Sequence, residues 1–208
     1  MEKNYYEECL SAISHYIGAG MAISGLVFLI LHSLHFENLG YTVGGIIFSL
    51  GLIFMYMMSG TYHILQNEKF RRNFRVLDHI AIYVTISASY TPYIFTVLTG
   101  KTKWIIFFIE WGLTLFGVIF KLFFTGKFKL LSTLIYLFMG WVILFVFKDI
   151  KNSLNPTSLY FLIASGVTYS VGAIVYMLRG IKFNHFTWHI FVLGGSILNF
   201  ISIYLIHY

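Results

Sequence analysis

Five polar side chains lie in or beside long apolar segments, where ionisable groups are costly. Ser59 and His63 are four residues apart, and His185 and His189 repeat that spacing. Residues four apart share one face of a helix and are separated by about 6 Å along its axis. Two imidazoles at this spacing can bind one metal ion. Asp78 lies between the two pairs in the sequence.

Together, these residue types have the composition of a hydrolytic metal site. His63, His185 and His189 would supply the three protein ligands of a catalytic Zn²⁺ site, with a fourth position open for water. Asp78 would orient that water, or a ligating imidazole, without contacting the metal. Ser59 would donate a hydrogen bond to a developing oxyanion. The sequence therefore predicts a zinc site with Asp78 and Ser59 as candidate catalytic residues.

Each of these residues also has a purely structural interpretation. The Ser59 hydroxyl can hydrogen-bond back along its own helix. Asp78 can form an interfacial ion pair or place a negative charge at a helix start. His79 points about 100° away from its neighbour Asp78 on a helix, so we expect it not to bind the metal. Three further histidines are expected at the opposite face, where they would only pack: His32, His35 and His207.

The composition determines the kind of element that must position these groups. Of 208 residues, 58% are hydrophobic and only 11% are charged, whereas soluble domains carry roughly 25% charged residues. Apolar runs of ~20 residues recur along the chain, which is the length of a helix that crosses a bilayer. They lack the alternation of a β-barrel strand. The net charge of +6 arises from basic residues in short loops, which favours lipid headgroups over nucleic acid as their partners.

The sequence thus predicts an all-α integral membrane protein, a bundle of seven transmembrane helices. We expect residues 1–208 to form one domain, because no linker is long enough to separate two. The predicted spans are 13–34, 41–65, 76–98, 103–124, 130–147, 157–178 and 185–206.

Orientation follows from the loop cations, which are enriched on the cytoplasmic side of membrane proteins. Ten of them would share the side of the N-terminus: Lys3, Lys69, Arg71, Arg72, Arg75, Lys121, Lys127, Lys129, Arg179 and Lys182. Four would lie opposite: Lys101, Lys103, Lys148 and Lys151. This split predicts a cytoplasmic N-terminus and an external C-terminus. It also places the five site residues at one face, although none of them entered the count.

Glu110 is a further acid within an apolar segment. An unpaired carboxylate there is costly, so it should face the bundle interior or be protonated. The alternative is an acid near the outer interface within reach of Lys101 or Lys103.

In order, Ser59-x-x-x-His63, Asp78 and His185-x-x-x-His189 resemble the bacterial hemolysin III family. That family is grouped with the progestin and adipoQ receptors and, more distantly, with the alkaline ceramidases. The segment SASYTPYIF and the opening EECLSAISHYIGAG are also similar to it. The resemblance implies seven helices, a cytoplasmic N-terminus, and zinc held by three histidines with the aspartate acting through water. In related eukaryotic members this site is associated with hydrolysis of ceramide-like amides, whereas the bacterial name implies cell lysis.

Three functions follow as hypotheses. The first is a zinc-dependent hydrolase of a lipid amide or ester, with a membrane lipid or fatty-acyl substrate, in the bacterial inner membrane. The second is a non-enzymatic receptor or regulator of membrane composition, with structural zinc joining the helices. Direct binding of Asp78 to the metal, as a fourth protein ligand, would favour this hypothesis. The third is a lytic protein, for which the sequence offers no amphipathic helix with a strongly polar face.

Overall fold

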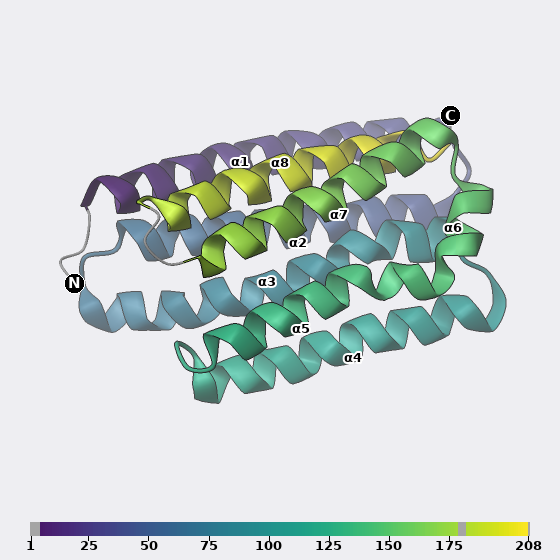
Figure 1. Ribbon diagram of the computed structural model, residues 1–208. Helices are drawn as coiled ribbons and strands as arrows, with labels where there is room; N and C mark the ends of the chain where they lie inside the picture. Colours follow the sequence, from purple (N-terminus) through teal and green to yellow (C-terminus); the bar gives the residue numbers. More distant parts are fainter. Residues whose placement is uncertain (1–4, 179–181, 208) are drawn as a thin grey trace.

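A computed structural model of the protein describes residues 5–178 and 182–207. Over these ranges the chain forms helices and turns, with no strand among the described residues. The helices are α1 (Tyr5–Ser33), α2 (Leu39–Ile64), α3 (Glu68–Thr96), α4 (Gly100–Phe124), α5 (Lys129–Trp141), the 3₁₀ helix η1 (Val142–Val146), α6 (Phe147–Ser153), α7 (Pro156–Met177) and α8 (Asn184–Tyr204). The long helices run side by side along one axis (Figure 1), which confirms the predicted all-α architecture.

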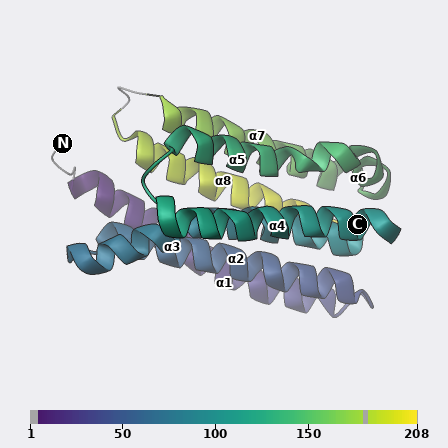
Figure 2. The ribbon, with the colours of Figure 1, turned by 90° about the horizontal axis from the view of Figure 1, so that it is seen from below.

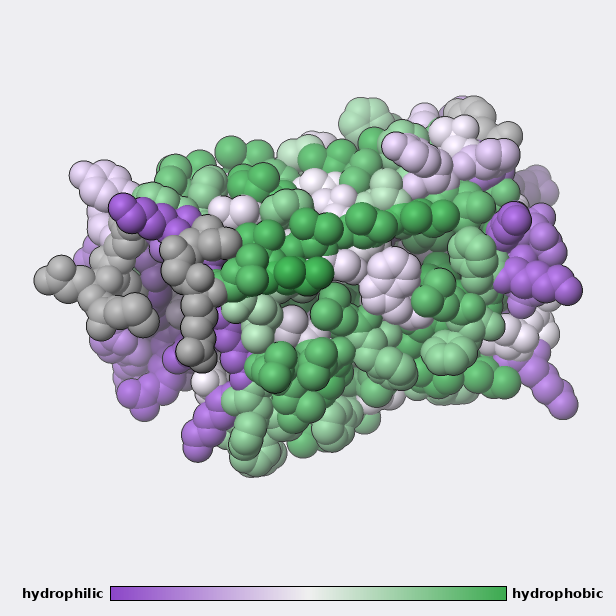
Figure 3. Space-filling view, in the orientation of Figure 1, coloured by the Kyte–Doolittle hydropathy of each residue, from purple (hydrophilic) through white to green (hydrophobic). Residues whose placement is uncertain are grey.

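The surface has the composition of a membrane-spanning bundle. Apolar side chains cover the middle of the visible face, and hydrophilic ones gather at its two ends (Figure 3). Six helical segments are long and apolar enough to cross a bilayer: α1, α2, α4, Lys129–Ser153, α7 and α8. The helix α3 is as long as α1 but does not reach the same apolar composition. The count of seven spans therefore stays a prediction, as does the orientation.

The lower hydropathy of α3 comes from a charged start and a polar buried face. Asn67 accepts hydrogen bonds from backbone N–H groups of the first turn, so the helix begins at Glu68 instead of residue 76 and includes the basic segment. Further along, the Thr85 hydroxyl donates to the carbonyl of Gly51 in α2, 3.1 Å away. Where α2 passes Pro92, a Cβ on Gly44 would lie 2.5 Å from the proline Cα. Close packing of α2 on α3 therefore requires glycine there.

The predicted fifth span, 130–147, is interrupted in the structure. The α-helical part ends at Trp141, and a 3₁₀ turn leads into α6. Tyr90 of α3 fits this break, because its hydroxyl donates to the Gly140 carbonyl and accepts from the Ile143 N–H. Backbone groups exposed by a helix break must find such partners where water is absent.

The two sides of the bundle differ in packing. The helix α1 packs closely on α2 and α8, α2 on α3, and α7 on α8, whereas α5 meets α3 and α7 over a smaller area. Figure 2 shows α5 beside α7, with the α1–α2–α3 group on the other side of the bundle. Hydroxyl contacts cross the tight side: Ser196 of α8 hydrogen-bonds both Tyr56 of α2 and Tyr169 of α7. The loose side is where a cavity forms.

Glu110 is fully buried, which confirms its interior placement. Its backbone carbonyl and its carboxylate both accept from the Ser87 hydroxyl of α3, at 2.8 and 3.3 Å. Three residues used in the orientation argument and its test, Lys3, Arg179 and Tyr208, lie outside the described part of the chain.

Candidate metal centre

The three predicted metal ligands lie together at one end of the bundle. His63 is in the last turn of α2, and His185 and His189 are in the first two turns of α8. One ring nitrogen from each lies within 4.8 Å of the other two. The His185 and His189 rings stack at 4.7 Å, and the His63 ring meets them edge-on at 5.0 and 4.9 Å. In the described chain, these three side chains form the group that could hold a metal ion.

The hydrogen bonding of the rings supports this assignment. His63 and His189 are buried, and their Nε2 atoms have no hydrogen-bond partner within the described chain. Their Nδ1 atoms, in contrast, both have partners. Buried polar atoms without a partner are uncommon and call for an explanation. A bound cation would supply one, and imidazole nitrogen suits zinc, copper, iron and nickel.

Glu8 of α1 holds the first of these rings. Its Oε2 lies 2.9 Å from Nδ1 of His63, and both of its oxygens accept from the Arg71 guanidinium at 2.9 Å. A carboxylate only accepts, so it favours the tautomer with the proton on Nδ1 of His63. That tautomer leaves the Nε2 lone pair free for a metal. Arg71 fixes the carboxylate and itself lies over the Tyr62 ring, 4.7 Å away.

Two more residues of α1 contact α8. Nε2 of His15 and Nδ1 of His189 are in hydrogen-bond contact. If His189 donates there, its Nε2 is also free to bind metal. Glu7 accepts from the backbone N–H groups of His185 and Phe186, at 3.2 and 3.4 Å, at the start of α8. An acidic group at this position stabilises a helix N-terminus. The start of α1 therefore supports each of the three candidate ligands.

Asp78 and Ser59 line the same cavity as His185 and His189. The Asp78 carboxylate is not part of the three-histidine group, and its Oδ2 is 3.5 Å from Nδ1 of His79. Ser59 is 1% exposed, and its hydroxyl makes no hydrogen bond within the described residues. The bond back along its own helix, the structural alternative, is therefore not formed. The catalytic roles of both side chains stay predictions.

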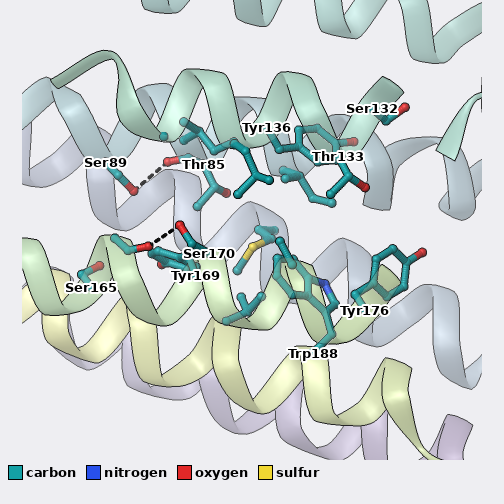
Figure 4. A pocket seen from close by; sticks show the side chains of 18 of the residues that line it. Thr85, Ser89, Ser132, Thr133, Tyr136, Ser165, Tyr169, Ser170, Tyr176 and Trp188 are labelled. Carbon is teal, nitrogen blue, oxygen red and sulfur yellow. Dashed lines mark hydrogen bonds between the residues drawn. The ribbon is translucent and has the colours of Figure 1, made fainter. Parts of the chain in front are cut away.

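The cavity has a volume of about 450 Å³ and runs between α3 and α5 on one side and α7 and α8 on the other. Figure 4 shows Ser132, Thr133 and Tyr136 on one wall, with Tyr176 and Trp188 on the other. The ring of Tyr176 also lies 5.5 Å from the His185 ring. The cavity therefore connects the histidine end of the bundle to its loosely packed side.

Three other histidines, His79, His32 and His207, lie as expected from the sequence. His79 hydrogen-bonds the Arg75 carbonyl through Nδ1, 2.8 Å away, and stays outside the three-residue group. At the other end of the bundle, His32 stacks on Tyr204 and His207 stacks on Phe36.

Comparison with known proteins decides the family. A family model described as haemolysin-III related matches residues 3–200. The chain belongs to this family. It is 37% identical over 197 residues to "Hemolysin-3" of Bacillus cereus, covering 95% of this chain and 90% of that protein. It is 38% identical over 197 residues to "Hemolysin-3 homolog" of Bacillus subtilis (strain 168), covering 95% and 92%. No solved structure matches the chain.

Animal proteins match the chain at greater distance. "Monocyte to macrophage differentiation factor" of Homo sapiens is 25% identical over 209 residues, covering 96% of this chain and 84% of that protein. With six apolar helices and these relatives, the haemolysin-III-related chain is a multi-pass membrane protein, consistent with a bacterial cell membrane.

Sequence reasoning assigned no role to Glu7, Glu8 or His15. A signal was present for two of them, because Glu8 and His15 are seven residues apart and so share one helix face. The predicted first span began at residue 13, however, whereas α1 begins at Tyr5 and carries both glutamates in its first turn.

The role of Glu8 can be tested through metal affinity. Glu8→Ala should weaken metal binding about 10- to 100-fold, as loss of a hydrogen-bond partner of a ligating histidine typically does. The measurement is metal affinity of the purified protein by competition with a chelator. Glu68→Ala, an exposed acid at the same end of the bundle, is the control and should keep wild-type affinity. Equal affinities in the two variants would rule out the positioning role of Glu8.

Proposed function

We propose that the protein is a zinc-dependent hydrolase that cleaves an amide or ester bond of a membrane lipid. The observation that carries the proposal is the shared cavity: Asp78 and Ser59 line it together with two of the three candidate ligands, His185 and His189. Three histidines with no fourth protein ligand in the described chain are the donor set of catalytic zinc sites, whereas structural sites usually have four. This ligand count favours a catalytic zinc site over a structural one.

In the proposed reaction, water adds to the acyl carbonyl, and the bond from the acyl carbon to the amide nitrogen or ester oxygen breaks. Zinc, when bound, supplies a Lewis acid and an acidified water. Asp78 accepts the proton from the attacking water and returns it to the leaving group. The Ser59 hydroxyl, which has no partner in the described chain, donates to the oxyanion. The products are a fatty acid and the free amine or alcohol.

The inner part of the cavity suits the acyl chain of such a substrate. Its lining includes Ile86, Leu137, Ile143, Leu144 and Leu162. The smaller packing area of α5 leaves this space between α5 and α7. Apolar side chains around this cavity would gain from burying a hydrocarbon tail.

We propose that α3 is the seventh span. It connects the end of α2 to the start of α4, and both of those helices have the length and composition of spans. The helix α2 ends at one end of the bundle and α4 begins at the other (Figure 1). The chain that joins them must therefore cross the same thickness. Its 29 residues reach about 43 Å, more than the ~30 Å of a bilayer core. Its polar side chains, Thr85, Ser87 and Thr91, are buried in the bundle and avoid lipid.

The first prediction from the proposed function concerns the metal content of the protein. The purified protein should contain about one zinc per chain. His63→Ala, His185→Ala or His189→Ala should each lower zinc affinity by more than ~100-fold, because loss of a direct ligand should exceed the loss of an outer partner. Elemental analysis checks the content. The controls His79→Ala and His207→Ala should retain zinc, and full occupancy in His185→Ala would show that the site is wrong.

The second prediction separates catalysis from metal binding. Asp78→Asn should keep zinc and lose ~10²–10⁴-fold in turnover, and Ser59→Ala should keep zinc and lose ~10²–10³-fold. The assay measures fatty acid released from a panel of acylated amide and ester lipids. Ser49→Ala is the matched control for Ser59, because Ser49 is also buried on α2 with no hydrogen-bond partner among the described residues but lines a different groove. Release by wild type no faster than by His185→Ala would count against the hydrolase.

The third prediction concerns topology, and it rests on the ten-to-four split of lysine and arginine. A reporter fused after Tyr208 should lie outside the cell membrane, and one inserted in residues 66–75 should lie in the cytoplasm. A cytoplasmic C-terminal reporter would contradict both the orientation and the odd number of spans.

A further inference from the structure

Lys121 is a buried cation in the last turn of α4. It is 1% exposed, and its Nζ donates to the Ser132 hydroxyl of α5, 2.5 Å away. The acids in the ion pairs between described residues are Glu8 and Asp78, and Lys121 takes part in none of these pairs. An ammonium carries three donors, and one hydroxyl satisfies only one of them. A buried charge of this kind needs a counter-ion.

The position of Lys121 in the helix does not by itself explain its burial. A cation in the last turn interacts favourably with the helix dipole. A lysine serving only that purpose, or snorkelling toward the interface, would extend its ammonium to solvent. Lys121 instead reaches inward and lines the cavity that contains His185 and His189. Its Nζ lies 5.9 Å from the ring centroid of Tyr136, another residue of the cavity wall.

The charge around this part of the cavity is strongly positive. Four cations line the cavity: Arg75, Lys121, Lys127 and Lys129. The one acid among its described lining residues is Asp78. The Ser132 hydroxyl, on the α5 wall (Figure 4), accepts from Lys121 and itself donates to the Phe128 carbonyl, 3.1 Å away. Ammonium and guanidinium groups around one space are donors that bind a phosphate.

We propose that Lys121 and Arg75 bind the phosphate of an acyl lipid, with the Ser132 hydroxyl positioning the Lys121 ammonium. The lipid phosphate supplies the counter-ion at the end of the cavity where α4 stops, and the acyl chain occupies the apolar part between α5 and α7. A free phosphate ion shares the anionic chemistry but leaves the apolar part unfilled. This inference rests on the proposed function only in placing the scissile carbonyl near the histidines; the phosphate site itself requires no turnover.

The experiment measures binding with probes that contain no ester or amide bond. Purified protein in a neutral detergent is titrated with an ether-linked hexadecylglycerol phosphate, with the matched hexadecylglycerol, and with inorganic phosphate. Wild type should bind the lipid phosphate roughly 10- to 100-fold more tightly than the neutral lipid, as hydrogen bonds to a charged group imply. Lys121→Met should remove this preference. Lys101→Met, an exposed cation in the first turn of the same helix, should keep it.

Each other outcome has a defined meaning. No preference in wild type, or an unchanged preference in Lys121→Met, overturns the phosphate site. Inorganic phosphate that binds as tightly as the lipid overturns the lipid as its occupant. Zinc content and a single elution peak show whether Lys121→Met is folded. If it is not, Lys121→Arg should retain the preference and Ser132→Ala should weaken it, and full preference in Ser132→Ala overturns the proposal.

Because no probe can be hydrolysed, the test is independent of catalysis. A protein that cleaves neutral and anionic lipids equally while showing no binding preference would retain the proposed function and lose this inference. A protein that prefers the lipid phosphate but releases no fatty acid would retain this inference and lose the hydrolase.

Discussion

The structure depends on one constraint: where lipid and packed side chains exclude water, buried polar groups need partners within the protein. The three candidate metal ligands would be a liability there, and the first turns of α1 compensate for them. Glu8 holds His63, His15 contacts His189, and Glu7 caps the helix that carries His185. Packing of α1 on both α2 and α8 is therefore a condition for the histidine group. Removing α1 would leave partnerless imidazoles in the interior, with a cost on the order of 1–3 kcal/mol for each unsatisfied group.

The same constraint divides the bundle into a tight half and a loose half. Glycines bring α1, α2 and α3 close: a Cβ on Gly18 would lie 2.6 Å from the Tyr56 ring, and one on Gly44 would meet Pro92. The loose half contains α5, whose helix is interrupted at η1. Tyr90 satisfies the backbone at that break from α3, so α5 can change course without packing tightly on its neighbours. Rigid ligands on one side and open space on the other are what a site with an internal substrate requires.

Sequence reasoning captured the features that depend on local pattern and missed those that depend on tertiary contact. Apolar runs located the helices, and the four-residue spacing identified His63, His185 and His189, because both signals are written in neighbouring residues. The contacts of Glu8 with His63 and of His15 with His189 join residues 55 and 174 positions apart. No periodicity encodes such a pairing. Lys121 was counted as a loop cation for the same reason, since its place near a helix end was visible but its inward direction depends on α5. The break in α5 depends likewise on a hydroxyl from another helix.

Lys121, the apolar lining and the proposed zinc site together restrict the chemistry of a ligand more strongly than any one of them does alone. A water-soluble anion would pair with Lys121 but leave the apolar lining between α5 and α7 unfilled. A neutral hydrocarbon would fill that lining but leave a buried ammonium without a counter-ion, at a cost that grows as water is excluded. A molecule with an anionic head, an acyl chain and a carbonyl between them satisfies the cation, the apolar lining and the proposed zinc site at once. Such molecules make up the bilayer around the protein. The geometry therefore favours a substrate that enters from the membrane over one that enters from water, because only the first is already oriented with its phosphate at the interface and its chain inside.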